Sequence, residues 1–290
     1  MSKRTMEYRG KTIYLAKFDV VFKAIFIGDG DYSLLASLLS SILNLDIKAE
    51  DIEVLNVEIA PDHKSGRLAR LDIRVKTACK RHINIEIQLY DEKNMDKRSI
   101  FHLSKLYTQQ LAVSMKFNDL HPAIAINILD FKYLPYTEYH NVYRLKNIRT
   151  NDELTDVFEI NFIEMPKIPS EINSPIDLWM KFLSAENEEE LEMLAKQSPV
   201  MEKAVQKLVH VSAEELVRYE MDMREKAELD YRSAMADSYD DGRQEGRQEG
   251  AEEKAYRAAE RALKRGVRPE DVAYDQELPL SKIMELKERL

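Results

Sequence analysis

Two neighbouring segments of the chain, 71–76 and 82–90, alternate strictly between apolar and polar residues. A period of two is typical of a β-strand that buries one face and exposes the other. The short segment 77–81 between them suits a tight turn. We therefore expect an antiparallel hairpin paired symmetrically about Cys79, with its aliphatic residues in the core and its polar residues on an exposed face.

Apolar residues recur every three to four positions in segments 17–26 and 33–43, before this hairpin, and in 98–117 after it. This spacing predicts three amphipathic helices. Short apolar runs predict further strands at 52–59, 123–129, 141–145 and 157–163. The order of these elements predicts a mixed α/β domain over residues 1–183.

From Ser174 onward the pattern is helical, and it predicts an α-helical extension over 184–241 followed by a tail over 242–290. The only tryptophan, Trp179, is expected to anchor the first of these helices to the core. The tail opens with Gly-Arg-Gln-Glu twice in succession and then Gly250. Because each glycine costs a helix about 1 kcal/mol relative to alanine, the repeat indicates either a close helix–helix contact or a flexible hinge.

The end of the chain, 262–290, reads as a helix closed by Gly266, a short helix, a turn and a last helix. This rhythm is similar to a helix-turn-helix that would help to target DNA. A small helical module for self-association fits the same pattern, and both interpretations stay open.

The net charge and the number of cysteines exclude several classes of protein. The 290 residues include 52 acidic and 43 basic side chains, and the net charge of −9 argues against a protein that coats nucleic acid. The single cysteine excludes a disulfide framework and a multi-cysteine zinc site. No signal-peptide core, apolar run of about 20 residues or glycine-rich phosphate loop occurs. We therefore expect a soluble, cytoplasmic protein with no membrane contact and no nucleotide cofactor.

The polar face of the expected hairpin carries two acids. In the symmetric register Asp72 lies opposite Glu86, with Cβ atoms about 5 Å apart. Like charges at this distance repel, and Mg²⁺ or Mn²⁺ would remove the conflict because such cations prefer hard oxygen ligands. The backbone carbonyl of Ile87 is a further candidate ligand. The alternative is that these polar residues are only the solvated face of a sheet.

Basic and polar residues surround this acid pair. Arg74 and Lys76 share the polar face, and the helix that follows the hairpin can approach it. The six histidines show no spacing typical of a metal site, and only His82 shares the face with Glu86. The residues expected to contact substrate phosphates are Arg74, Lys76, Arg98, Lys105, Tyr107 and Gln109.

Four stretches, Phe18–Phe26, Arg70–Ile73, Asn84–Gln88 and Leu106–Leu111, together resemble the recombination-promoting nuclease / putative transposase family of the PD-(D/E)XK nuclease superfamily. The resemblance extends over about residues 17–182. It implies a restriction-endonuclease-like mixed sheet flanked by helices. It also implies a metal-dependent DNA endonuclease with a role in recombination or DNA mobility.

The resemblance also implies roles for individual residues. Asp72 and Glu86 would ligate the metal, and Asp19 of the first helix would be an additional acid. Gln88 stands where the superfamily usually has lysine, although glutamine is usual in this family. A neutral amide orients water without supplying charge, so the metal must supply most of the water activation. Lys23 or Lys105 is the candidate for the missing positive charge.

The leading hypothesis is thus a Mg²⁺-dependent DNA endonuclease, which would need two copies of its site, hence a homodimer, to cut both strands. The competing hypothesis is a catalytically reduced DNA-binding or protein-interaction module that retains the nuclease fold. Gln88 and the acidic net charge favour the second hypothesis, and the intact pair of Asp72 and Glu86 opposes it.

Overall fold

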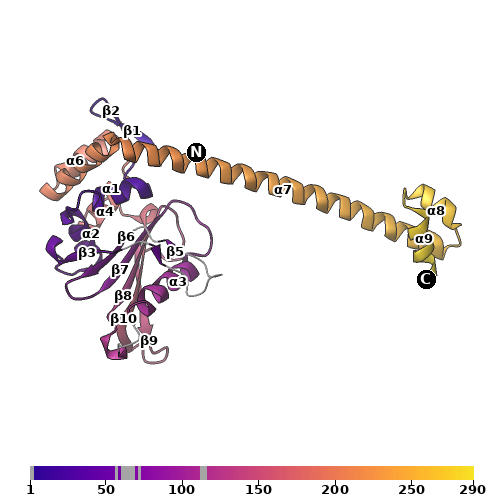
Figure 1. Cartoon of the computed structure of the whole chain (residues 1–290), viewed down its shortest axis with the longest axis horizontal. Coiled ribbons are helices and arrows are strands. Elements are labelled where there is room, and N and C mark those ends of the chain that lie inside the picture. The colour runs from indigo at the N-terminus through magenta and orange to yellow at the C-terminus, as the bar shows by residue number, and fades with distance from the viewer. Residues whose placement is uncertain (1–2, 56–57, 60–68, 71–72, 112–115) are drawn as a thin grey trace. The chain divides into compact units, whose positions relative to one another are not determined.

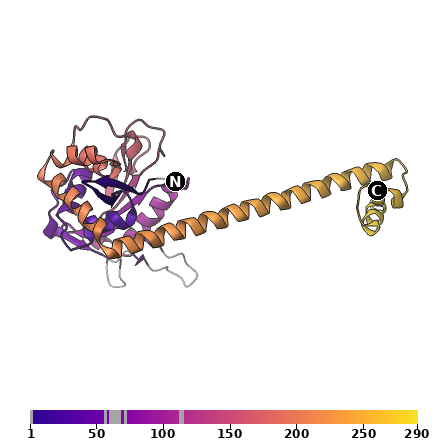
Figure 2. The same cartoon turned by 90° about the horizontal axis from the view of Figure 1, so that it is seen from above.

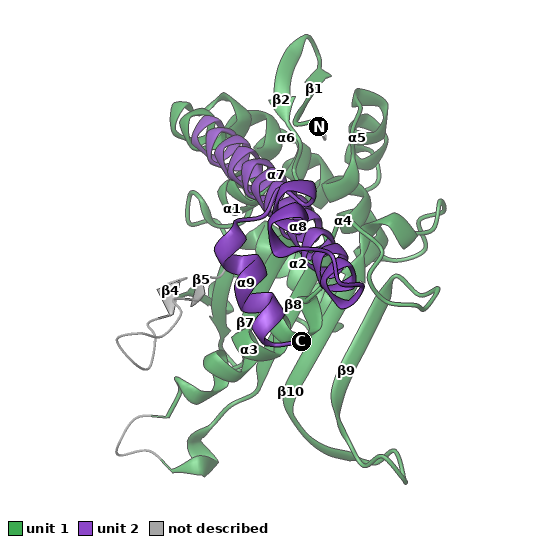
Figure 3. Cartoon of the chain, turned by 90° about the vertical axis from the view of Figure 1, so that its right-hand side faces the viewer, with its two compact units in different colours: residues 1–221 green, residues 222–290 purple. Residues whose placement is uncertain are grey.

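The structure is a computed structural model that describes residues 3–55, 58–59, 69–70, 73–111 and 116–290. Its chain divides into two compact units, residues 1–221 and 222–290, which Figure 3 shows in different colours.

A six-stranded mixed sheet forms the centre of the first unit. Its spatial order is β3 (Ile52–Val54), β6 (Ile73–Thr77), β7 (His82–Gln88), β8 (Ala123–Leu129), β10 (Glu153–Glu164) and β9 (His140–Lys146). β8 runs parallel to both β7 and β10, whereas the other neighbouring strands are antiparallel. The predicted mixed sheet flanked by helices is therefore confirmed.

Helices cover both faces of this sheet (Figure 1). The large core cluster on one face takes its helical residues from α1 (Asp19–Ile27), α2 (Ser33–Leu43), α4 (Pro175–Ser184), α5 (Glu188–Ala195), α6 (Pro199–Ala213) and the start of α7 (Glu215–Lys264). The opposite face is covered by α3 (Met95–Thr108), whose Leu103 and Leu106 pack on Ala123 and Ala125 of β8. The sheet is thus buried on both sides, as an α/β arrangement requires.

Trp179 of α4 occupies the position that its sequence context predicts. Its ring lies 5.4 Å from that of Phe26 and 5.9 Å from that of Phe182, and the side chain is almost completely buried. The indole N–H donates to the hydroxyl of Ser37 in α2, so the buried polar end of the ring is satisfied. The expectation that Trp179 anchors the first helix after Ser174 to the core is confirmed.

A small N-terminal hairpin, β1 (Thr5–Tyr8) and β2 (Lys11–Tyr14), was not predicted. Its turn residues Arg9 and Gly10 both have positive φ angles, 48° and 71°, which is the geometry of a two-residue hairpin turn. Arginine is an unusual residue at the first of these positions, so the sequence pattern did not predict the turn.

Several predicted boundaries are wrong. The strand predicted over 157–163 begins four residues earlier, at Glu153. The strand predicted over 52–59 is divided, because β3 pairs with β6 whereas β4 (Glu58–Ile59) pairs with β5 (Ala69–Arg70). The helix predicted over 98–117 begins earlier and ends at Thr108. Beyond that end, the Gln110 side chain binds the backbone N–H and carbonyl of His121 at 3.0 and 3.1 Å, in place of a further helical turn.

The second unit contains most of α7 (Glu215–Lys264), followed by α8 (Pro269–Asp275) and α9 (Leu280–Glu288). A small core of Ala259, Val272 and Ile283 joins these helices. Gly266, with φ +84°, ends α7 in the left-handed region, as its sequence context predicts. No helix in the described part of the chain combines the length and apolar character needed to cross a membrane.

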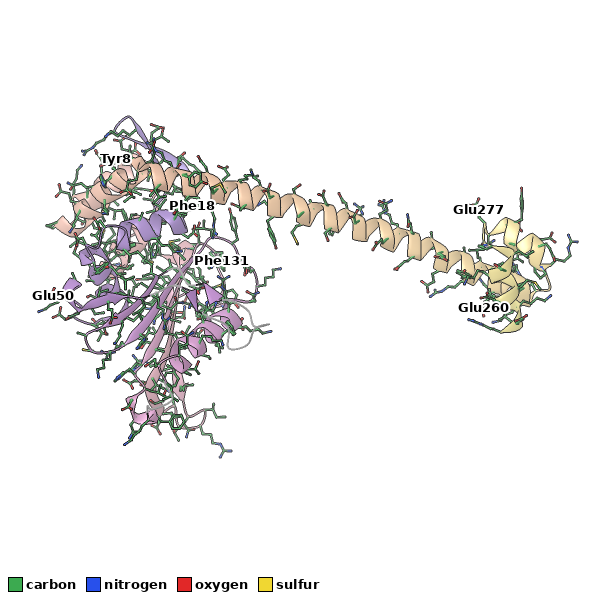
Figure 4. All side chains as sticks on the ribbon, in the orientation of Figure 1. Tyr8, Phe18, Glu50, Phe131, Glu260 and Glu277 are labelled. Atoms are coloured by element: carbon green, nitrogen blue, oxygen red, sulfur yellow. The ribbon has the colours of Figure 1, made fainter. Side chains whose placement is uncertain are left out.

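The glycine repeat lies inside α7, which Figure 2 shows as one uninterrupted helix. A Cβ atom built at Gly242, Gly246 or Gly250 would meet nothing within 4 Å. Figure 4 shows side chains above and below the ribbon along this helix. A close helix–helix contact at these glycines is therefore not made among the described residues of the single chain.

Candidate functional site

The hairpin of β6 and β7 has the register that the sequence predicts. The observed pairs are Ile73 with Ile85, Arg74 with Asn84, Val75 with Ile83 and Lys76 with His82. In every pair the two residue numbers are equally distant from Cys79, which confirms the symmetric register. Asp72 precedes the first of these pairs and lies outside the described residues. Its pairing with Glu86, the next step of the same register, stays a prediction.

Glu86 is 1% exposed and Asn84 is 1% exposed, because α3 covers the polar face of β7. The expectation that this face is open to solvent is wrong for these two residues. The reason is the amphipathic character of α3, which buries Leu103 and Leu106 on β8 and brings its polar residues over β7. The simple solvated-face interpretation of the hairpin therefore does not hold at Glu86.

Two side chains of α3, four positions apart, contact the carboxylate of Glu86. Nδ1 of His102 lies in hydrogen-bond contact with Oε1, and Nε of Arg98 lies 3.4 Å from Oε2. The Asn84 amide also donates to Oε1, at 3.3 Å. A buried carboxylate needs such partners because desolvation strongly disfavours an isolated charge. Glu86 is thus held in place by its own strand and by one face of α3.

His102 is the residue of this site that the sequence reasoning missed. Its spacing from Arg98 places both on one face of α3, and that signal was present in the sequence. A polar line continues across the sheet, where Asn127 of β8 donates to Ser99 of α3 at 2.9 Å and to the Asn161 carbonyl of β10 at 3.1 Å. The sequence did not predict this row of polar residues, because each strand contributes a single polar residue and only strand pairing brings these residues together.

Some buried polar atoms of this face have no hydrogen-bond partner. In the described part of the chain these atoms are Nε of Arg74, Nδ1 of His82, Oδ1 of Asn84 and Oε2 of Glu86. Most buried polar groups in proteins are paired, so orphaned atoms need an explanation. All of these lie on adjacent positions of one hairpin face, which makes that face the strongest candidate for a ligand site.

The electrostatics of the hairpin change along its length. Burial, together with the positive charges of Arg74 and Lys76 and the neighbouring His121, lowers the pKa of His82 to about 4. Burial also lowers the pKa of Arg74 below its usual value. The end of the face near His82 is therefore electropositive, and the end at Glu86 carries the acid.

The structure spreads the other predicted catalytic residues over two sides of the sheet. Gln88 ends β7 half-buried, and its carbonyl accepts from the N–H of Asp130 at 2.9 Å. Asp19 and Lys23 lie half-buried on α1, which belongs to the core on the face opposite to Glu86. The Ile87 side chain is buried in that same core. The roles assigned to these residues stay predictions.

The predicted substrate contacts are also dispersed. Lys105 lies 5.9 Å from the ring of Phe101 on the outer side of α3, and Gln109 is exposed where the helix ends. Tyr107 instead packs edge-on against Phe158 of β10, at 4.8 Å between ring centroids. Arg74 and Arg98 therefore lie next to the acid-bearing face, whereas Tyr107 belongs to the packing between α3 and the sheet.

Among the described side chains, no group of three or more His, Cys, Asp or Glu residues has the arrangement of a metal site. The predicted ligand pair includes Asp72, which lies outside that set. Glu86 itself offers a buried carboxylate oxygen with no hydrogen-bond partner, and this is a hard oxygen ligand of the kind that Mg²⁺ prefers.

A mixed sheet with an acid on the second strand of its hairpin and helices on both faces defines an α/β fold of the PD-(D/E)XK nuclease type. A family model described as PD-(D/E)XK nuclease family transposase matches residues 16–238. The chain therefore belongs to this family, and the resemblance drawn from the sequence is confirmed. Neither the curated proteins nor the solved structures contain a significant match to the chain.

Proposed function

We propose that the chain is a divalent-metal-dependent DNA endonuclease that hydrolyses phosphodiester bonds in DNA recombination or transposition. Membership of a nuclease family supports the reaction class. The single observation that carries the proposal is the Glu86 carboxylate, which is 1% exposed, is fixed by His102 and Arg98, and keeps one oxygen without a hydrogen bond.

The metal would be held by Asp72 and Glu86, with the backbone carbonyl of Ile87 as a further oxygen ligand. The fit rests on Oε2 of Glu86, which has no hydrogen-bond partner but lies 3.4 Å from Nε of Arg98, and on a ligand set made only of oxygen atoms, which suits Mg²⁺ and also Mn²⁺. When bound, the cation supplies a Lewis acid that polarises the phosphate and makes water a better nucleophile.

The protein's own residues orient the reacting groups. His102 and Asn84 engage Oε1 of Glu86, whereas Oε2 has no hydrogen bond and lies 3.4 Å from Nε of Arg98, so Oε2 is the oxygen that would bind the cation. Gln88 follows on the same strand, and its amide can accept and donate hydrogen bonds that position a water molecule. Lys76, Arg98 and Lys105 supply positive charge for the phosphates of the DNA strand.

Plasmid nicking in Mg²⁺ tests this proposal. Asp72→Asn and Glu86→Gln each remove one ligand charge with almost no change of shape, and we expect each to lower nicking at least a hundredfold. Glu50→Gln is the matched control, because Glu50 is exposed on the turn before β3 (Figure 4). Wild-type nicking by folded Glu86→Gln protein, or an equal loss in Glu50→Gln, would contradict the proposal.

The second candidate function is a catalytically reduced DNA-binding module. Gln88, in the place where the superfamily usually has lysine, is the observation that favours it. The two functions differ in their response to metal, since a cation that binds only the folded state raises the melting temperature. A melting temperature that Mg²⁺ or Ca²⁺ raises in the wild type but not in Glu86→Gln supports the nuclease. DNA binding by a wild type that shows neither this rise nor nicking supports the reduced module.

A further inference from the structure

Two of the orphaned atoms on the hairpin face belong to side chains that can donate hydrogen bonds, Nε of Arg74 and Nδ1 of His82. Arg74 lies on β6 directly opposite Asn84, and His82 lies opposite Lys76 on the neighbouring strand. In an antiparallel pair these residues share one face and neighbour each other along it. Along this face Arg74, opposite Asn84, therefore lies one step from the position of Glu86, and His82 lies two steps from it.

Arg74 has no ion-pair partner in the described part of the chain. Among the described residues, Glu53 of β3 is a carboxylate that acts on His82, and it pairs with Lys76 at 3.7 Å. The Arg74 side chain is half-buried, and its Nε has no hydrogen-bond partner among the described residues. A half-buried guanidinium without an anion is costly, because arginines removed from water normally pair with carboxylate or phosphate.

Hydrogen bonds fix the backbone of the histidines near Arg74. His121 lies close enough to act on His82, and its backbone is held by two hydrogen bonds to the Gln110 side chain. The backbone N–H of His82 donates to the Pro122 carbonyl at 2.8 Å, which joins β7 to the same segment. The low pKa of His82 keeps its ring neutral near pH 7, so it can offer one N–H without adding charge.

We propose that Arg74, with His82 and Lys76 beside it, binds a phosphate group of a polynucleotide strand next to the acid-bearing position of the hairpin. The forked donors of Arg74 match phosphate oxygens, and His82 adds a neutral hydrogen bond. Arg74 follows the predicted metal ligand Asp72 by two residues in the sequence. The anion site stands on its own geometry, whereas its assignment to a nucleic acid rests on the proposed function.

DNA binding without cleavage tests this site. The affinity of a fluorescent single-stranded or duplex oligonucleotide would be measured in EDTA over a series of salt concentrations. We expect Arg74→Gln to weaken binding about tenfold and to reduce the slope of log affinity against log salt by about 1, the signature of one lost phosphate contact. Lys11→Gln, on the exposed part of β2, is the control for one lost charge and should change neither quantity.

Glu86→Gln separates this inference from the proposed function. It should lose nicking yet keep the wild-type salt slope, and Arg74→Gln should keep the stabilisation by Mg²⁺ while losing the phosphate contact. Titration with inorganic phosphate distinguishes the two sources of the anion. Heat of binding from phosphate alone, with DNA affinity unchanged in Arg74→Gln, would overturn the assignment to a polynucleotide and leave a small-anion site.

Arg74→Lys is a second variant that tests the site even if Arg74→Gln fails to fold. It retains the charge but loses the forked donor geometry, so we expect a weakening of about threefold with the salt slope preserved. Affinity and slope equal to wild type in a folded Arg74→Gln protein would overturn the proposal. An equal loss in Lys11→Gln would do the same, because it would show that only the total charge matters.

Discussion

At the scale of single residues, the burial of Glu86 is the central feature of the site. This residue is a fully buried acid on a central strand, and burial of this kind is tolerated only because Arg98 and His102 approach it from α3. The sequence was sufficient to predict the register of β6 and β7 about Cys79, since alternation on two strands fixes which side chains share a face. It was not sufficient to show that α3 covers that face, because this depends on how the helix packs.

His82 provides a prediction at the same scale. In the folded chain its pKa is lowered to about 4 by burial, by Arg74 and Lys76 of β6 and by His121, while Glu53 of β3 acts weakly in the opposite direction. The unfolded chain takes up this proton near pH 6.5. Between these values the unfolded state binds more protons, so the free energy of unfolding should fall as the pH is lowered from about 6.5 towards 4.

Urea unfolding in phosphate-free buffers from pH 7 to pH 5 measures this effect. We expect His82→Phe to lose part of the pH dependence that the wild type shows between pH 6.5 and pH 5, whereas His210→Phe should retain it, because that histidine is exposed on α6. Identical pH profiles for wild type and His82→Phe would show that His82 is not kept neutral by its surroundings.

At the scale of elements, periodicity predicted the strongly patterned segments well. The hairpin, β8 and β9 were placed to within a residue or two, and α1 and α2 were located by their apolar stripes. The divided strand at 52–59 was not predictable, because the choice of partner strand is made by tertiary structure. The N-terminal hairpin was missed because its strands are only four residues long and its turn begins with Arg9.

The glycine repeat gives a prediction about α7. A Cβ atom at Gly242, Gly246 or Gly250 would meet nothing within 4 Å, so three alanines fit without a clash and each should favour the helix by about 1 kcal/mol. We expect the triple alanine variant to slow amide hydrogen exchange over residues 238–254. The Ser238→Ala variant is the control and should change exchange much less.

Faster exchange in the triple variant, or loss of a dimer detected by light scattering, would contradict this prediction. Such a result would mean that the glycines serve a close contact with a second copy of the chain, the interpretation that the sequence had left open beside a hinge. Slower exchange with an unchanged oligomeric state would show that the glycines loosen the helix.

At the scale of the whole molecule, each of the two units has its own core. The large cluster of the first unit joins the sheet to α1, α2, α4, α5, α6 and the start of α7, and the second unit has the small core of Ala259, Val272 and Ile283. The nuclease family match covers residues 16–238, which includes the entire sheet. The proposed chemistry therefore belongs to the first unit, and targeting of DNA or self-association is the proposed task of the second.

The central claim is that Asp72 and Glu86 share a single cation, and isothermal titration with Mn²⁺ tests it most directly. The measurement would compare wild type, Asp72→Asn, Glu86→Gln, the double variant and Glu50→Gln as the control. The account predicts that either single substitution abolishes the tightest binding event, that the double variant loses nothing more, and that the control binds like wild type. Unchanged Mn²⁺ binding in folded Asp72→Asn or Glu86→Gln protein, or independent and additive losses in the two, would contradict it.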